Sequence, residues 1–317
     1  MSVLLAKYFV TGDDHYSSNN RGNHKDYSYE TLYYARKKLD IAKERGITHW
    51  ISTGDFTYGR FNRLEYRIEV EKILQEQRNL TNGNHYMIKG NHDISNKGMT
   101  EYEYYLDKGM FKSGTNIAVG NCNINMVDHG KHETTDVIIE EGKTNLLFTH
   151  GCFTFNTSNY FKNFNPIILD NFEKWFGIDM IISGHIHTRT IVDGVMYKGN
   201  RGKKLLIDYL PCLSRPEYKN GDNEEIGYVA IVEVYDDTVK YEVIEFPLLP
   251  LEESFALEKM KKDMEHKETI RINMGNVVSS VNSFDRNIGN PEDIINGKMD
   301  VSKEIRDKAI ELYRNAG

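Results

Sequence analysis

Two histidines, His185 and His187, follow an apolar stretch that ends at a glycine in the sequence IISGHIHT. Residues two positions apart on extended backbone point to the same side, so both imidazoles can face one point while Ile186 turns toward a core. Metal ligands use this geometry. The alternative is a pair of histidines on a surface loop, and this stretch alone does not decide between the two interpretations.

Four other polar clusters share the same context, because each of them also follows a short apolar run. The runs span residues 4–10, 49–53, 86–89, 145–149 and 179–183, and their composition predicts buried strands. The clusters behind them are Gly12-Asp13-Asp14-His15, Gly54-Asp55, Gly90-Asn91-His92-Asp93, His150-Gly151 and Gly184-His185-Ile186-His187. Ligands bind outside the carboxyl ends of strands in α/β sheets. We therefore expect all five clusters to meet on one rim.

The side chains of these clusters offer carboxylate, amide and imidazole donors and no thiolate. Such a set suits two divalent ions about 3.5–4 Å apart, bridged by a carboxylate, as in hydrolytic phosphoesterase sites. Two cations can bind the oxygens of a phosphate ester, supply hydroxide near neutral pH and hold the attack in line. A structural turn explains any one cluster equally well, but it does not explain five in this order.

The sequence GNH occurs twice and provides an internal comparison. The first copy, residues 83–85, precedes the predicted strand at 86–89 and would lie at the wrong end of it. The second copy, residues 90–92, follows this strand. Only the second copy is therefore assigned to the site.

Helical patterns separate the first predicted strands. Residues 29–45 and 63–78 carry apolar side chains at helical spacing beneath charged ones. Strands that alternate with helices imply a partly parallel sheet. Farther along, residues 227–235 and 239–246 flank a pair of aspartates, which predicts a hairpin that completes a sheet.

The last part of the chain has a different character. Residues 251–270 are charged and helical in pattern, residues 271–300 are rich in Asn, Gly and Ser and predict loops, and residues 301–315 predict an amphipathic helix. We therefore expect a catalytic domain over residues 1–250 and a C-terminal helical and loop extension over residues 251–317. This extension is a candidate for a reduced capping or partner-docking segment.

Composition limits the classes of partner and compartment. The chain has 317 residues, 39% of them hydrophobic, and a net charge of −7, so it can build a sizeable core and has no global positive field to attract nucleic acid. Its three cysteines form no CxxC pair, which fits a reducing cytoplasm. The N-terminal apolar stretch is interrupted by Lys7 and no run is long enough to span a membrane. We expect a cytoplasmic protein without a membrane partner.

Together the clusters resemble the calcineurin-like metallophosphoesterase superfamily, whose motifs D-x-H, G-D, G-N-H-[DE], H and G-H-x-H all occur between Asp13 and His187. The resemblance implies an α/β fold, a four-layer α/β/β/α sandwich of two mixed sheets flanked by helices. It also implies two divalent ions as cofactors, most simply Mn²⁺, with Fe, Zn or Ni as alternatives. By position, one ion would bind Asp13, His15 and His187, the other Asn91, His150 and His185, and Asp55 would bridge both.

The same resemblance implies roles for the two residues after Asn91. His92 would not bind metal but would contact the phosphate or protonate the leaving group, and Asp93 would orient it. Tyr58, Arg60, Arg63 and Arg189 lie near the predicted strand ends and are candidate substrate contacts, with a solvated loop as the alternative for each arginine. His129 and His132 are expected to be surface or structural residues whose loss spares activity.

Details of the motifs indicate which branch of the family the chain resembles. Ser/Thr protein phosphatases read DRG after the second motif and GNHE in the third, whereas this chain reads GDFTYGR and GNHD. The segments 209–218 and 227–248 after the last motif are similar to the Mre11/SbcD DNA-repair nucleases. That branch usually has His or Asp three residues after the bridging aspartate, where this chain has Tyr58. The similarity implies a DNA nuclease whose partner is an SbcC/Rad50-like ATPase docked by C-terminal helices, with residues 301–315 as the candidate dock.

Two other functions remain open at this stage. One is a phosphatase or phosphodiesterase for nucleotides or other small phosphate esters, which the acidic charge would suit. The other is a non-catalytic scaffold built on the metal site, against which the complete ligand set and His92 argue. A homodimer is also compatible with the sequence.

Overall fold

The computed structural model describes residues 2–20, 23–58, 62–95, 98–155, 166–169, 172–198, 201–214, 225–283 and 303–315. The chain divides into two compact units, Met1–Phe255 and Ala256–Gly317. The first unit contains two six-stranded sheets, and both of them are mixed.

The first sheet has the strand order β14-β13-β1-β2-β3-β4. Three of its strands, β1 (Leu4–Thr11), β2 (His49–Ser52) and β3 (His85–Met87), run parallel, and β4 (Lys112–Ser113) continues in the same direction. The predicted hairpin is formed by β13 (Ile226–Tyr235) and β14 (Val239–Pro247), and β13 pairs antiparallel with β1. The hairpin therefore completes the sheet, as the sequence predicts.

The second sheet has the strand order β11-β12-β10-β7-β6-β5. Its parallel centre consists of β6 (Cys122–Val127), β7 (Thr144–His150), β10 (Met180–Gly184) and β12 (Arg201–Tyr209). The edge strands β5 (Ile117–Val119) and β11 (Thr190–Lys198) pair antiparallel with it. A small separate pair, β8 (Phe153–Thr154) and β9 (Ile167–Ile168), follows β7 in the chain.

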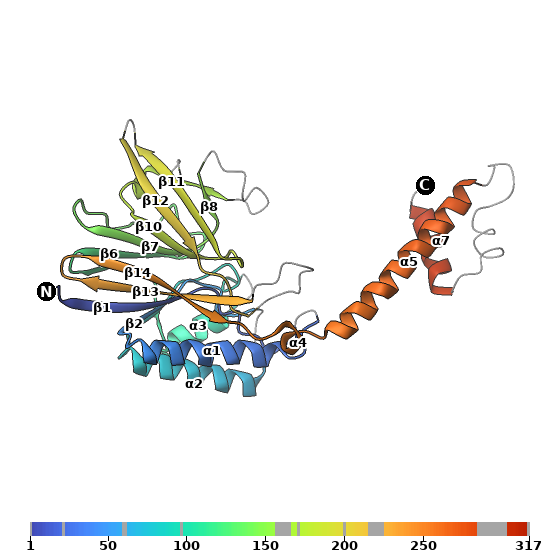
Figure 1. Cartoon of the computed structure of the whole chain (residues 1–317), viewed down its shortest axis with the longest axis horizontal. Coiled ribbons are helices and arrows are strands. Elements are labelled where there is room, and N and C mark those ends of the chain that lie inside the picture. Colours follow the sequence, from blue (N-terminus) through green and yellow to red (C-terminus); the bar gives the residue numbers. More distant parts are fainter. Residues whose placement is uncertain are drawn as a thin grey trace. The chain divides into compact units, whose positions relative to one another are not determined.

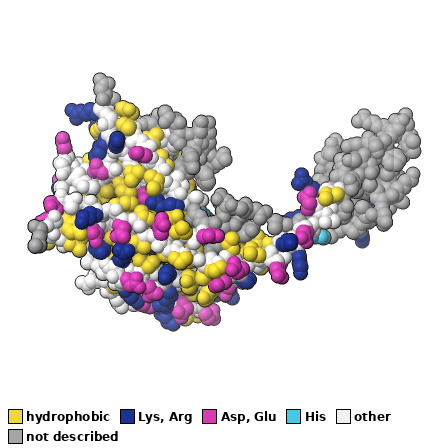
Figure 2. Space-filling model, in the orientation of Figure 1, with side chains coloured by type: hydrophobic (Ala, Val, Ile, Leu, Met, Phe, Trp, Pro, Cys, Tyr) yellow, Lys and Arg dark blue, Asp and Glu magenta, His cyan; other side chains and the backbone are white. Residues whose placement is uncertain are grey.

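Helices cover the first sheet on its outer face, where α1 (Tyr27–Glu44) and α2 (Leu64–Leu80) lie next to each other (Figure 1). The Asp26 carboxylate caps α1 by accepting a hydrogen bond from the Tyr29 amide at 3.0 Å. A capping box at Thr100 and Glu103 begins the short α3 (Glu101–Asp107). Figure 2 shows acidic and basic side chains intermixed over this layer, and Glu76 on α2 pairs with Arg36 and Lys43 on α1.

Three apolar layers hold the first unit together. The strand period of two directs Phe9 toward the helices and its neighbours Tyr8 and Val10 into the space between the two sheets. A third layer, on the outer face of the second sheet, surrounds the fully buried Trp175 in the 3-10 helix Glu173–Trp175. The expected α/β fold of two mixed sheets with flanking helices is confirmed.

The end of the chain is more helical than the sequence predicts. The short α4 (Leu251–Ser254) ends the first unit, and the second unit contains α5 (Leu257–Ser283) and α7 (Lys303–Asn315). The prediction of loops from residue 271 is wrong up to Ser283, because weak local helix propensity does not prevent continuation of a helix that has already begun. Residues 284–300 lie outside the described residues. None of the described helices is both long enough and apolar enough to span a bilayer.

Candidate metal centre

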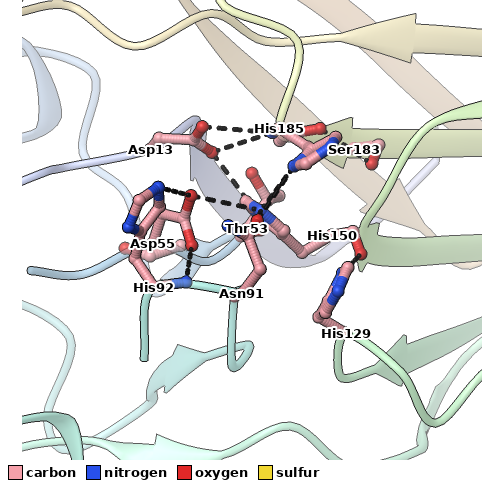
Figure 3. A network of polar contacts seen from close by, with 12 residues as sticks. Asp13, Thr53, Asp55, Asn91, His92, His129, His150, Ser183 and His185 are labelled. Atoms are coloured by element: carbon pink, nitrogen blue, oxygen red, sulfur yellow. Dashed lines mark hydrogen bonds and ion pairs between the residues drawn. The ribbon is translucent and has the colours of Figure 1, made fainter. Parts of the chain in front are cut away.

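The five predicted clusters converge, and they come from the strand ends of two different sheets. Asp13 follows β1, Asp55 follows β2 and Asn91 follows β3 in the first sheet, whereas His150 ends β7 and His185 follows β10 in the second. Figure 3 shows these side chains facing one another between the strand ends. The apolar runs identify the buried strands, but they do not show which of the two sheets contains each strand.

The first donor group consists of Asp13, His15 and His187, whose ligating atoms lie within 4.8 Å of one another. The Nε2 atoms of His15 and His187 are 3.1 Å apart. The Oδ2 atom of Asp13 lies 3.4 Å from Nε2 of His187 and 3.8 Å from Nε2 of His15. His187 belongs to this first group, whereas His185 belongs to the second group, and both side chains face the centre.

The second donor group consists of Asp55, His150 and His185, with Asn91 beside them. The Oδ1 atom of Asn91 lies 2.9 Å from Nε2 of His150 and 2.9 Å from Nδ1 of His185. Nδ1 of His150 lies 2.9 Å from the Thr53 carbonyl, which can only accept a hydrogen bond. The Nδ1 atom therefore carries a proton, and Nε2 of His150 is directed toward the other donors.

Asp55 lies between the two groups. Its Oδ2 atom is 3.3 Å from Nε2 of His150 in the second group and 3.8 Å from Nε2 of His15 in the first. Its Oδ1 atom accepts a hydrogen bond from the backbone N–H of His92 at 2.8 Å. The Asp55 carboxylate therefore lies close to imidazoles of both donor groups.

The electrostatics of these side chains fit a bound cation. Burial alone would raise the pKa of Asp13 and Asp55, but the nearby His150 lowers both, so the two carboxyl groups are ionised. Burial lowers the pKa of His15 to about 3 and that of His185 to about 4, so both imidazoles are neutral. Metal ligands need these same protonation states.

His150 shows how strongly the carboxylates attract positive charge. Its burial would lower its pKa, but Asp13 and Asp55 raise it to about 9. A divalent cation among these donors would satisfy the same carboxylates without protonating His150. The residues present therefore fit metal ions, and oxygen and imidazole donors without a thiolate suit hard or borderline ones.

The backbone at the centre is strained where three of these residues stand. His15, Asp55 and His185 have φ angles of 48°, 47° and 83°, which L-residues adopt rarely. Local hydrogen bonds hold this conformation, since the His15 amide donates to the Asp55 carbonyl at 2.9 Å and the His185 amide donates to Asp13 at 3.1 Å. Strain of this kind gathers at functional sites, where the surrounding structure must enforce it.

Two of the motif glycines leave room for the carboxylates. A Cβ atom on Gly90 would overlap the backbone nitrogen and Oδ1 of Asp55, and one on Gly184 would overlap Oδ1 of Asp13. These contacts give a steric reason for glycine at the start of the third and fifth clusters.

His92 and Asp93 occupy different environments. The His92 side chain is 36% exposed, and its Nε2 atom lies 4.0 Å from Oδ2 of Asp55. Asp93 is fully buried and accepts hydrogen bonds from the amides of Gly90, Phe56 and Thr57 at 2.9, 3.1 and 3.3 Å. Burial, together with Asp55, raises the pKa of Asp93 to about 7. These hydrogen bonds of Asp93 fix the loops after β2 and β3.

The predicted substrate contacts are distributed differently. The ring of Tyr58 packs on His92, whereas the Arg63 guanidinium donates to the Ser18 carbonyl at 2.5 Å. Arg189 pairs with the Asp208 carboxylate, its Nη2 donating at 2.7 Å, and lies over the ring of Tyr228. Arg60 lies outside the described residues. These positions do not test a role in substrate binding, which stays a prediction for all four.

One histidine beside the centre was not expected there. Nδ1 of His129 lies 3.1 Å from the His150 carbonyl, and its ring is stacked 6.0 Å from that of His185 (Figure 3). His132 packs against Phe153 at 5.3 Å and is buried. His129 follows β6, the parallel neighbour of β7, so it lies beyond the carboxyl end of a strand as the five clusters do.

Comparison with known proteins identifies a family model and similar solved structures. A family model described as calcineurin-like phosphoesterase matches residues 6–189, and no curated protein matches the chain. A dimetal phosphatase from Danio rerio is a similar solved structure, with 12% identity, a TM-score of 0.46, and coverage of 78% of this chain and 100% of that one. A Vps29 double mutant from Entamoeba histolytica has 17% identity, a TM-score of 0.31, and coverage of 76% and 99%.

The family model covers more than half of the chain and includes every candidate ligand from Asp13 to His187. The matched segment begins in β1 and ends just after the GHIH motif. The chain therefore belongs to the calcineurin-like phosphoesterase family.

Proposed function

We propose that the protein is a metal-dependent hydrolase of phosphodiester bonds, and that DNA is its substrate, as for nucleases of the SbcD/Mre11 type. The observation that carries the hydrolase proposal is the position of Asp55, whose carboxylate lies between two groups of oxygen and imidazole donors. One carboxylate between two such groups is the arrangement that a dinuclear hydrolytic centre requires.

Each donor group would hold one ion. Asp13, His15 and His187 would bind the first, Asn91, His150 and His185 would bind the second, and Asp55 would contact both. When bound, such ions supply a hydroxide near neutral pH and neutralise the charge on the phosphate. Mn²⁺ is the ion that we would test first.

The side chains around the ions have separate tasks. In hydrolysis an oxygen from water bonds to phosphorus, the bond from phosphorus to the leaving oxygen breaks, and that oxygen takes up a proton. His92 is partly exposed and close to Asp55, so it is placed to contact the phosphate or to give this proton. Asp93 would act through the loops by holding the backbone on which His92 stands.

The choice of DNA rests on the segments after His187 that are similar to Mre11/SbcD nucleases. A second candidate is hydrolysis of nucleotides or other small phosphate esters. The pairing of cations near the centre favours this second candidate, because Arg189 binds Asp208 and Lys38 binds Asp14. A non-catalytic scaffold would not need an exposed histidine beside the bridging carboxylate.

The experiment measures hydrolysis of bis-p-nitrophenyl phosphate and p-nitrophenyl phosphate, then of labelled single- and double-stranded DNA, with added Mn²⁺. The Asp55→Asn variant serves as the control. Cleavage of the diester and of DNA by the wild type alone supports the nuclease. Turnover of small esters without DNA cleavage supports the second candidate, and no turnover despite bound metal supports the scaffold.

We also propose an SbcC/Rad50-like ATPase as the partner and a cytoplasmic location. The second unit, with α5 and α7, is the candidate dock. The full chain should retain such an ATPase in a pull-down, and a truncation to residues 1–300 should not. Equal recovery by both would remove this role for α7, and gel filtration would show whether the chain is a homodimer.

A further inference from the structure

A cavity of about 330 Å³ lies beside the second donor group. His185 belongs both to its wall and to that donor group, and Gly151, the residue after His150, is a second wall residue. His129 also lines it and is held against the centre through the His150 carbonyl at 3.1 Å. The cavity is therefore directly connected to the place where a phosphate would bind.

The cavity and His92 are on different sides of the centre. His92 lies near the first donor group, 5.2 Å from the ring of His15, whereas His129 lies 6.0 Å from the ring of His185. Figure 3 shows His92 and His129 on opposite sides of Asn91. If His92 faces the leaving oxygen, the cavity is available to the other organic group of a phosphodiester, the one that stays on phosphorus.

The size of the cavity fits an organic group. Ligand pockets in proteins start at about 300 Å³, so this volume suits one ring system with a sugar and is larger than a bare phosphate needs. Cys152, Ile167 and Phe172 provide an apolar wall. The described lining residues include neither lysine nor arginine, so none of them offers a charge partner for a second phosphate.

The polar groups of the cavity favour a ligand with N–H or O–H donors. The His150 carbonyl can only accept, so Nδ1 of His129 carries its proton and Nε2 of the neutral ring is an acceptor. Glu133 is also a lining residue, and its carboxylate oxygens can only accept hydrogen bonds. A nucleoside combines such donors with an apolar ring face.

We propose that this cavity binds the single nucleoside that stays attached to phosphorus when a phosphodiester is cut. This inference rests on the proposed function and narrows its substrate to diesters whose retained group is one uncharged nucleoside. Both a small nucleotide diester and the terminal nucleotide of a DNA strand meet this description.

The test uses the full chain with Mn²⁺ and measures binding by calorimetry, which needs no turnover. The ligands are inorganic phosphate, methyl phosphate and thymidine 5′-monophosphate. Thr134 lines the cavity and is exposed, so Thr134→Trp would fill the cavity from the surface. Thr135→Trp places the same side chain one residue away, outside the lining residues, and is the matched control.

We expect the wild type and Thr135→Trp to bind thymidine 5′-monophosphate at least tenfold more tightly than the two small ligands. Thr134→Trp should lose this preference and keep its affinity for phosphate. Equal affinities in the wild type, or an unchanged preference in Thr134→Trp, would overturn the inference. Diester hydrolysis without a nucleoside preference would remove the cavity proposal alone, and a preference without hydrolysis would remove the proposed function alone.

A last comparison distinguishes a small nucleotide diester from the terminal nucleotide of a DNA strand as the source of the nucleoside. Thr134→Trp is assayed with thymidine 5′-monophosphate p-nitrophenyl ester and with a labelled oligonucleotide. Loss of activity on both supports the terminal nucleotide of a strand as a natural ligand, and loss on the ester alone supports a small diester. Full activity on both substrates would contradict the proposal.

Discussion

The ring of Tyr58 packs 4.8 Å from the imidazole of His92 at an interplanar angle of 41°, and it stands edge-on to His15 at 5.6 Å. Tyr58 therefore contacts both the candidate proton donor and a candidate ligand. The Mre11/SbcD branch usually has His or Asp at this position, whereas in this chain a phenol ring packs against His92.

Removing this ring should misplace His92. We expect Tyr58→Ala to lower kcat on a diester about 10- to 100-fold, the loss that a small displacement of a reacting group produces. Tyr58→Phe keeps the ring and should keep most of the activity, while the metal content of both variants stays that of the wild type. A strong loss in Tyr58→Phe would show that the hydroxyl, and not the packing of the ring, is the important contact.

Replacing the Asp55 carboxylate, the proposed bridge, should abolish the function of both donor groups. Asp55→Asn is expected to lower activity more than about 100-fold, because even the loss of an outer partner of a metal ligand costs about 10- to 100-fold. Metal content, measured by mass spectrometry, should fall with it. Normal content and activity in this variant would place the bridge elsewhere.

His92→Ala should separate metal binding from turnover. Its side chain lies at the edge of the centre with Nε2 4.0 Å from Asp55, so we expect both ions to remain bound. A general acid contributes about 10²- to 10⁴-fold to rate, and kcat should fall within that range. Loss of metal from this variant would identify His92 as a ligand.

The two GNH copies give a matched pair of glycine substitutions. Gly90→Ala places a Cβ atom on Asp55 and should reduce metal content and activity. Gly83→Ala meets no atom within 4 Å, and its φ of +80° costs only about 1–2 kcal/mol of stability, so activity should remain. Metal analysis and thermal denaturation of both proteins check this; equal activity would mean that Asp55 tolerates the displacement.

Acid should destabilise the protein partly through His85. This residue is fully buried between Trp50 and Phe111, and burial lowers its pKa from 6.5 to about 3. The unfolded chain therefore binds the proton more readily, and the free energy of unfolding falls as pH drops from 6.5 toward 3. His85→Phe should flatten this part of the pH dependence, as measured by urea denaturation. An unchanged slope would assign the loss to other groups.

The sequence predicts the site better than the surroundings of the site. Buried strands are apolar on both faces, so β1, β2, β7 and β10 begin and end within about a residue or two of the predicted runs. The donors come directly after these strands. Their order along the chain therefore identifies the centre before any packing is known.

Contacts between distant segments are harder to predict. Arg189 pairs with Asp208 because β11 and β12 are neighbours, and nothing near Arg189 in the sequence indicates this pair. His129 was missed because its strand, β6, carries polar asparagines, and Asn123 and Asn125 are buried through hydrogen bonds to neighbouring segments. Because these asparagines are polar, the sequence of β6 resembles that of a solvent-exposed strand although the strand is buried.

The hydrogen bond from the His185 amide to Asp13 joins residues 172 positions apart, which follow strands of different sheets. During synthesis the chain must extend past β10 before the two halves of the centre can meet, and closing so long a loop is slow. Earlier in synthesis only incomplete sets of ligands exist. We therefore expect metal uptake to be a late event that reports the docking of the two sheets. Once bound, the ions should stabilise the docked sheets against separation.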